Sequence, residues 1–273
     1  GGSLYLVWRN HRQRAYRERS GVQLLTLARD LKRRKARERR AQFVAEGVRA
    51  VEELLRSPLP VRGVLHTAAA AQTPRGAALL DDVARRAVES VEVDEKDFLS
   101  AADTEHPQGI LAVADVPVHT LASLTFPAST RMLVLDAVQD PGNAGTLVRT
   151  AAALGVSPVV ALPGTADLWN AKAVRSGVGA HFRIPAVHAS PEEFSACLAA
   201  QHITLWGADA AGEAVDAVTA PARLALAVGN EGAGLSAGVR AACAKFVGLP
   251  MSAAVESLNV SVAAGIMLCA LRT

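Results

Sequence analysis

The second half of the chain alternates short apolar runs with stretches of helical periodicity, and this alternation limits the possible folds more than any other feature. The clearest run, Met132–Asp136, is apolar through Leu135, which is typical of a strand covered on both faces. Strands that alternate with helices predict an α/β fold, with a mostly parallel sheet and helices on both faces. The other strands that we expect here are 158–162, 203–206 and 224–228, and the helices are 146–154 and 171–178.

The first half predicts a small α/β domain over residues 20–116. Apolar residues recur every three or four positions between Gly21 and Arg40, which predicts one helix there. Prolines, serines and threonines gather in 117–129, which we interpret as a linker to a second domain at 130–273. Residues 1–19 form a basic tail. Within the small domain we expect strands at 61–65, 91–93 and 110–114, and helices through 51–55 and 77–89.

Composition places the chain among globular proteins, because 50% of its 273 residues are hydrophobic. The closing apolar run, Val260–Leu271, is shorter than the roughly 18 residues that a membrane-spanning helix needs. The N-terminal residues carry charges without the apolar stretch of a signal peptide. The three cysteines lie far apart and predict neither a disulfide framework nor a zinc site. We therefore expect a cytoplasmic protein.

Charge is distributed unevenly along the chain. Residues 1–49 hold 14 Arg and Lys against 4 Asp and Glu, a local charge of +10, whereas the remainder has a net charge of −7. Such asymmetry indicates an element that meets a polyanion, and contacts with phosphates would bind nucleic acid without reading its sequence. A solvated helix face or a disordered tail would have the same composition. The candidate RNA-binding residues of this run are Arg33, Arg34, Lys35, Arg37, Arg39 and Arg40.

Three polar, glycine-bearing segments follow apolar runs in the second half, at Asp140–Arg149, Gly229–Leu235 and Leu249–Gly265. In open sheets of this kind, ligands bind beyond the carboxyl ends of the strands. Glycines allow a ligand to approach the backbone closely, and helix starts expose unpaired N–H groups. Together the three segments predict one composite site.

Each segment also has a purely structural interpretation. The first has the composition of a tight turn, which would leave Arg149 as a surface helix residue, and Glu231 is placed to cap the next helix. Ser257 and Asn259 readily accept backbone N–H bonds at a helix start. The chain has no glycine-rich Lys-Ser/Thr loop, and no Gly-x-Gly-x-x-Gly follows a strand. Nucleotide-dependent phosphoryl or hydride transfer is therefore poorly supported.

The three segments together resemble the motifs of the SpoU (TrmH-like) RNA 2′-O-ribose methyltransferases of the SPOUT superfamily, in the family's order. They read Asp-Pro-Gly-Asn-Ala-Gly-x-x-x-Arg, then Gly-Asn-Glu-Gly-x-Gly-Leu, then Pro-Met-x-x-x-Val-Glu-Ser-Leu-Asn-Val-Ser-Val-Ala. Segments 170–176 and 179–185 resemble the central region of the family. The basic helix and Phe43–Gly47 resemble the substrate-binding domain of rRNA-directed members.

This resemblance implies S-adenosyl-L-methionine as the methyl donor with no metal, a deep trefoil knot in the catalytic domain, and a homodimer with its site near the subunit interface. It implies 23S-type rRNA as the substrate, with tRNA as the alternative. The catalytic residues that it implies are Asn143, Arg149, Glu231, Ser257 and Asn259. The donor-binding residues are Gly229, Asn230, Gly232, Leu249, Met251 and Leu258, and Lys172 and Arg175 join the RNA-binding set.

By the same resemblance, Arg149 would activate the ribose 2′-hydroxyl. It would act as a base assisted by an RNA phosphate, or as a cation that positions the phosphate and stabilises the developing alkoxide. A guanidinium is almost always protonated, which makes the first role awkward. The sequence departs from the family at Ala253, where glycine is usual, and alanine would weaken donor binding if a positive φ is required there.

Two rival hypotheses come from other classes of protein. One is an RNA-binding assembly factor that kept the fold and lost turnover, which Ala253 alone favours. The other is a small-molecule α/β enzyme with an incidental basic tail, which predicts that removing residues 20–40 leaves activity unchanged.

Overall fold

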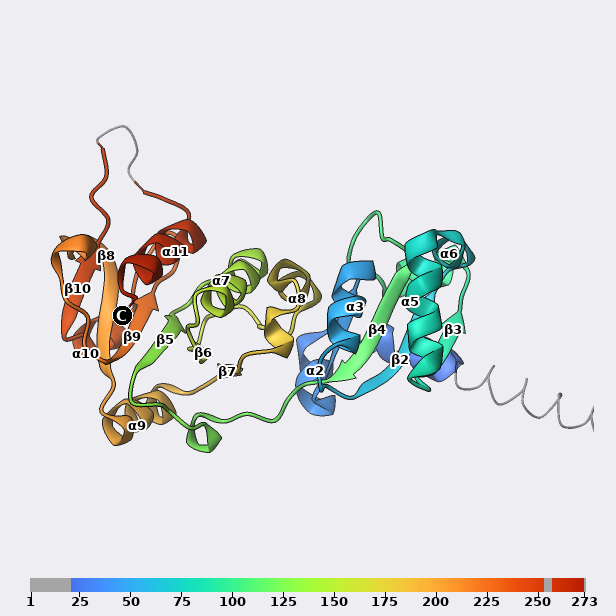
Figure 1. Ribbon diagram of the computed structural model, residues 1–273, viewed down its shortest axis with the longest axis horizontal. Coiled ribbons are helices and arrows are strands. Elements are labelled where there is room, and N and C mark those ends of the chain that lie inside the picture. Colours follow the sequence, from blue (N-terminus) through green and yellow to red (C-terminus); the bar gives the residue numbers. More distant parts are fainter. Residues whose placement is uncertain (1–20, 253–256, 273) are drawn as a thin grey trace, which may run out of the picture. The chain divides into compact units, whose positions relative to one another are not determined.

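The chain forms two units, and each is built on its own β-sheet (Figure 1). The first unit ends at Pro117 and the second begins at Val118. The computed structural model describes residues 21–252 and 257–272. Among the described helices, none is both long enough and apolar enough to cross a membrane.

The first unit is built on a four-stranded sheet in the order β1-β4-β2-β3. Strand β4 is antiparallel to both of its neighbours, and β2 and β3 are parallel. Two short helices, α4 and α6, were not expected from the sequence. The elements are β1 (Gln42–Glu46), α3 (Val48–Leu55), β2 (Val61–His66), α4 (Ala68–Gln72), α5 (Pro74–Arg85), β3 (Ser90–Glu92), α6 (Glu95–Ala101) and β4 (Ile110–Asp115).

The single helix expected from Gly21 to Arg40 is interrupted. The chain is helical at 21–30, turns, and becomes helical again as α2 (Arg34–Arg40). Arg37 holds the turn, because its guanidinium donates to the carbonyl oxygens of Leu31 and the next residue over 2.7 and 2.9 Å. The apolar periodicity continued through the turn and therefore did not reveal it.

The second unit contains a six-stranded, wholly parallel sheet in the order β10-β8-β9-β5-β6-β7. Helices flank it, which confirms the predicted α/β fold with a parallel sheet. The helices are α7 (Pro141–Ala153), α8 (Ala171–Gly177), α9 (Pro191–Gln201), α10 (Ala237–Ala242) and α11 (Val260–Ala270). The strands are β5 (Thr130–Leu135), β6 (Val159–Ala161), β7 (Ala186–His188), β8 (Thr204–Ala214), β9 (Arg223–Val228) and β10 (Lys245–Gly248).

Burial on both faces explains the continuous apolar runs of the central strands. Leu133, Val134 and Leu135 of β5 are fully buried, and each such side chain contributes about 1.5–3 kcal/mol when removed from water. The elements that the sequence did not predict, β7, α9 and β10, are two strands of three or four residues and a helix with few buried positions. Such elements carry too little periodicity to be recognised.

One glycine sets the position of α7. At Gly145 the helices α7 and α8 approach so closely that a Cβ atom would lie 2.1 Å from the carbonyl oxygen of Ala173. Only glycine fits at this contact, so the first polar segment is held firmly against α8.

Candidate functional site

The first two polar segments leave the sheet side by side. Strands β5 and β9 are parallel neighbours in the sheet. After β5 the chain continues to β6 on one side of this pair, and after β9 it continues to β10 on the other side. Asn230 Nδ2 donates to the carbonyl oxygen of Ala137 over 3.0 Å, and the Ser236 N–H donates to Asp136 Oδ2 over 2.6 Å. A switch point of this kind is where open α/β sheets bind ligands.

The second segment folds back on itself through Asn230. Its backbone exchanges two hydrogen bonds with Gly234, of 2.9 and 3.0 Å, and its Oδ1 accepts from the N–H groups of Gly232 and Ala233, both over 2.9 Å. Gly229 lies so close to this loop that a Cβ atom would be 2.2 Å from the carbonyl carbon of Gly234. The loop is therefore tightly closed on itself.

The third segment is joined to the first through Asn259, which caps α11. Asn259 Oδ1 accepts from the Ser261 N–H over 2.9 Å, as the capping interpretation predicts. At the same time its Nδ2 donates to Asn143 Oδ1 over 3.0 Å. One amide side chain thus both starts the helix and faces the first segment.

Asn143 is the residue at which all three segments meet. Its Nδ2 donates to Glu231 Oε1 over 3.0 Å, while its Oδ1 accepts from Asn259. Ser261 Oγ donates to its carbonyl oxygen over 3.2 Å, and its own N–H donates to Asp140 Oδ2 over 3.2 Å. Every polar group of Asn143 is used, so its orientation is defined.

Glu231 is held as a carboxylate. Partial burial acts to raise its pKa, but hydrogen bonds from Asn143 Nδ2 and from backbone N–H groups outweigh that effect and lower the pKa below its ordinary value. One of these backbone donors is Gln139, at 3.4 Å from Oε2. The site therefore presents a fixed negative charge beside the Asn143 amide.

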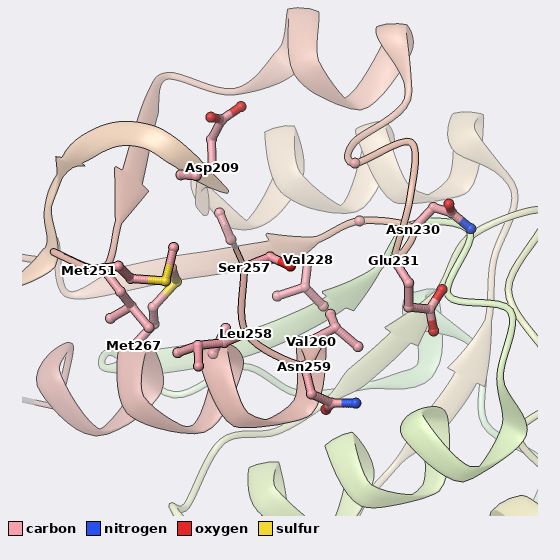
Figure 2. Close-up of a pocket in the computed structure, with 16 residues that line it drawn as sticks. Asp209, Val228, Asn230, Glu231, Met251, Ser257, Leu258, Asn259, Val260 and Met267 are labelled. Carbon is pink, nitrogen blue, oxygen red and sulfur yellow. The ribbon is translucent and has the colours of Figure 1, made fainter. Parts of the chain in front are cut away.

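A cavity of about 390 Å³ lies where the second and third segments face each other (Figure 2). Met251, Met267 and Leu258 gather on one side of it, and Asn259 and Glu231 lie on the other. The cavity is thus apolar at one end and polar at the other. It is lined by Ala208, Asp209, Ala210, Val228, Gly229, Asn230, Glu231, Gly234, Leu249, Met251, Ser257, Leu258, Asn259, Val260, Ala263 and Met267.

Most of the predicted donor-binding residues line this cavity. Gly232 is the exception, since its N–H is used within the turn by Asn230. The cavity also includes positions that sequence reasoning missed. Ala263 and Met267 follow Asn259 at intervals of four residues, so the sequence signal for them was the spacing of one helix face. Residues 208–210 come directly after the apolar first half of β8, so their signal was a position at the end of a strand. Both signals were present in the sequence. The predicted residues that line the cavity are Gly229, Asn230, Glu231, Leu249, Met251, Ser257, Leu258 and Asn259.

Arg149 lies apart from these residues. It is exposed on α7, does not line the cavity of its own chain, and has no hydrogen-bond or ion-pair partner among the described residues. Lys172 forms an ion pair with Asp140 over 2.5 Å, which places it directly beside the first segment. Arg175 lies in the last turn of α8 and is partly buried.

The basic run divides into several kinds of residue. Arg37 is 5% exposed and engaged with backbone carbonyls, so it is not available to bind RNA. Three other arginines have acidic neighbours: Arg33 and Arg40 with Asp30, and Arg34 with Glu38. The remaining two cations, Lys35 and Arg39, are exposed and lack a partner among the described residues.

Part of the third segment lies outside the described residues, including Ala253 and Glu256. The effect of Ala253 on the donor site therefore stays a prediction. In residues 21–252 and 257–272, no three His, Cys, Asp or Glu side chains are grouped so that they could hold a metal ion.

Comparison with known proteins bears directly on this geometry. Residues 130–269 match the SpoU rRNA methylase family, and residues 26–112 match an MRM3-like substrate-binding domain. The chain belongs to the SpoU rRNA methylase family. The family resemblance of the three motifs is thereby confirmed.

Relatives of this SpoU-family chain match it over most of its length. The 23S rRNA (guanosine(2553)-2′-O)-methyltransferase RlmP of Bacillus subtilis is 35% identical over 88% of this chain and 92% of its own. The SpoU methyltransferase AviRb of Streptomyces viridochromogenes, solved in complex with AdoMet, has a TM-score of 0.82 at 28% identity, covering 90% of this chain and 96% of that one. The AdoMet-bound rRNA methyltransferase of Sinorhizobium meliloti has a TM-score of 0.79 at 26% identity, covering 91% and 93%.

Proposed function

We propose that this SpoU-family protein transfers a methyl group from S-adenosyl-L-methionine to a ribose 2′-hydroxyl of 23S-type rRNA. The observation that carries the proposal is the junction of three motifs at Asn143, beside a cavity at the switch point of the sheet. The names of the B. subtilis and S. viridochromogenes relatives point to the same chemistry.

The cavity suits the methyl donor in size and in lining. Its volume lies within the range of about 300–1,000 Å³ found for small-molecule sites. The apolar end, with Met251, Met267 and Leu258, would hold the adenosyl part, and Gly229 lines the same cavity. The bound donor supplies a sulfonium methyl group, and the residues around it supply orientation, which accounts for much of the rate in a displacement of this kind.

Glu231, Asn143 and Asn259 would orient the reacting end of the site. Their hydrogen bonds to one another fix the directions of these side chains, and fixed polar groups need little reordering during the reaction. We assign Arg149 the role of a cation that positions an RNA phosphate and stabilises the developing alkoxide, because a guanidinium is a poor base. Its exposed side chain is free to meet such a partner.

A homodimer is part of the proposal. Helix α11 is apolar almost throughout, yet Val262 and Ile266 are 51% and 48% exposed, beside a hollow of about 440 Å³ between α7 and α11. Exposed apolar faces of this kind mark interaction surfaces. Because Asn143 and Asn259 also line the hollow, a second copy seated there would place the site at the edge of the interface.

Lys35 and Arg39 are the candidates for phosphate contact in the first unit, because they lie one helical turn apart on α2 and have no partner among the described residues. We place the activity in the cytoplasm. Transfer to tRNA, or RNA binding without turnover, are the alternatives.

Two measurements test the function. Methylation of ribosomal RNA with labelled donor, followed by mapping of the ribose modification in RNA from a deletion strain, should locate one 2′-O-methyl group that the strain lacks. Calorimetry should detect binding of S-adenosylmethionine. A protein that binds RNA but no donor at millimolar concentration would favour the assembly factor, and unchanged activity after removal of residues 20–40 would favour the small-molecule enzyme.

A further inference from the structure

Strand β8 leaves the sheet ladder in its middle and returns several residues later. Its pairing with β10 moves from Phe246 opposite Gly207 directly to Val247 opposite Glu213. The pairing with β9 ends at Gly207. Residues 208–212 therefore form an excursion without partners in the register of either neighbouring strand, which we call the 208–212 bulge.

This bulge is one wall of the cavity. Ala208, Asp209 and Ala210 line it together with the second polar segment, and Figure 2 shows Asp209 well separated from Asn230 and Glu231. The bulge is packed tightly against β10, since a Cβ atom at Gly248 would lie 2.6 Å from the carbonyl oxygen of Asp209. Unpaired backbone at a cavity wall needs another restraint if the cavity is to keep its shape.

That restraint is an ion pair. Arg240 Nη2 donates to Asp209 Oδ2, and Asp209 Oδ1 accepts from the Ala211 N–H over 2.9 Å. Among the described residues, the bond from Arg240 is the one side-chain hydrogen bond that joins the bulge to another element. The guanidinium also lies over the ring of Phe246, 4.9 Å from its centroid, which fixes its direction.

Arg240 is itself anchored to the other wall of the cavity. It belongs to α10, whose N-cap is Ser236, and the Ser236 N–H donates to Oδ2 of Asp136, which directly follows β5. The Arg240 N–H donates to the Ser236 carbonyl oxygen over 2.9 Å. A continuous series of contacts thus runs from β5, through the end of the second segment and α10, to the 208–212 bulge.

We infer that Arg240 is a positioning residue for the methyl donor, which acts through Asp209 to hold the 208–212 bulge at the distance from the second segment that the donor requires. The inference rests on the proposed function, because it assigns this cavity to the donor. Arg240 does not itself line the cavity, so we expect its loss to weaken donor binding and to leave the chemical step and RNA binding unchanged.

The chain offers a matched control on the same pair of strands. Lys245 forms an ion pair with Glu213 over 2.9 Å and lies 5.4 Å from the centroid of the Trp206 ring. Lys245→Ala therefore removes one ion pair and one cation–π contact between β10 and β8, and Arg240→Ala removes the same two kinds of contact between α10 and these strands. Neither Lys245 nor Glu213 lines the cavity.

The experiment measures the Kd and KM for S-adenosylmethionine, the kcat, the Kd for rRNA and the Tm of the full-length protein. Arg240→Ala should raise the Kd and KM for the donor about fivefold, the ratio that corresponds to loss of one partly exposed ion pair. The kcat and the RNA affinity should stay within about twofold, and Lys245→Ala should leave the donor Kd within the same limit. Arg240→Lys, which keeps the charge, should restore part of the affinity.

If Arg240→Ala does not fold, Arg240→Met gives the same test. It keeps an unbranched apolar side chain that can pack on the Phe246 ring, and it removes the charge. Equal donor Kd in wild type and in the Arg240 variants overturns the inference, and so does an equal weakening by Lys245→Ala. If the wild type itself binds no S-adenosylmethionine, the proposed function fails instead.

Discussion

Asn143 shows how one side chain makes a site out of three distant segments. Its amide donates to Glu231 and accepts from Asn259, and these partners lie 88 and 116 residues away in the sequence. An amide can donate and accept in fixed directions at once, whereas an acidic side chain only accepts when ionised. The residue type is therefore dictated by its two unlike partners.

Asn143→Ala should lower kcat/KM about 10- to 100-fold, because the Glu231 carboxylate loses its side-chain donor and Asn259 loses an acceptor. Steady-state methylation assays measure this effect. Thr146→Ala, one turn further along α7, removes only a bond to the Gly142 carbonyl oxygen and serves as the control. A similar loss in both variants would contradict the role of Asn143.

Arg149→Ala should abolish measurable methyl transfer, with a loss of at least about 10²-fold. Because Arg149 is exposed and has no partner among the described residues, its replacement should change the free energy of unfolding by no more than about 0.5 kcal/mol. Donor affinity by calorimetry and thermal unfolding provide the controls. Turnover comparable to wild type would exclude the assigned role.

His181 provides a test of stability against pH. Burial lowers its pKa from 6.5 to about 4, and the ring packs edge-on against Trp169. The unfolded chain therefore binds the proton more strongly than the folded chain, and stability falls as pH decreases from about 6.5 toward 4. Between pH 7 and 4.5 this group should cost roughly 2–3 kcal/mol.

His181→Leu should remove that part of the acid sensitivity, measured by urea unfolding at both pH values. His119→Leu, at an exposed position, should leave it unchanged. An acid sensitivity that is the same in His181→Leu and in wild type would show that the histidine is not buried in the neutral form.

At the scale of elements, α2 carries two kinds of cation: one that stabilises the fold and others that are exposed to solvent. Arg37 is buried against backbone carbonyls, while Lys35 and Arg39 lie one turn apart, are exposed and have no partner among the described residues. A count of basic residues in the sequence treats all of them alike. Only the packed helix distinguishes their roles.

The Lys35→Ala/Arg39→Ala double variant should weaken RNA binding and lower the slope of log K against log salt by about 2, because two phosphate contacts are lost. Filter binding over a range of salt concentrations measures both quantities. The Arg33→Ala/Arg34→Ala variant has the same change in charge but removes cations that are paired with Asp30 and Glu38. If the two double variants have equal effects, α2 acts only through its net charge.

At the scale of the whole molecule, the apolar face of α11 is the feature that a single chain leaves uncovered. Ile266→Glu should convert a dimer into a monomer, because it places a charge on that face, while the Tm of the monomer should change little at a half-exposed position. Light scattering measures the mass. Val22→Glu, at an apolar position that is 66% exposed in the first unit, should remain dimeric. A wild type that is already monomeric would exclude the homodimer.

The amino-acid sequence alone was sufficient for the class of fold, the family and half of the cavity lining. Continuous apolar runs indicate buried parallel strands, and glycine-bearing turns after them indicate a ligand site, because both patterns follow from local chemistry. The trefoil knot implied by the resemblance stays a prediction, since periodicity carries no information about how the chain threads.

Only the tertiary structure decided which polar groups meet. The break before α2, the burial of Arg37, the bond between Asn143 and Asn259, and the 208–212 bulge held by Arg240 all depend on contacts between residues placed by packing rather than by neighbouring sequence. The physical reason is that a side chain's hydrogen-bond partners are fixed by the geometry of the folded sheet, which brings together segments that are a hundred residues apart.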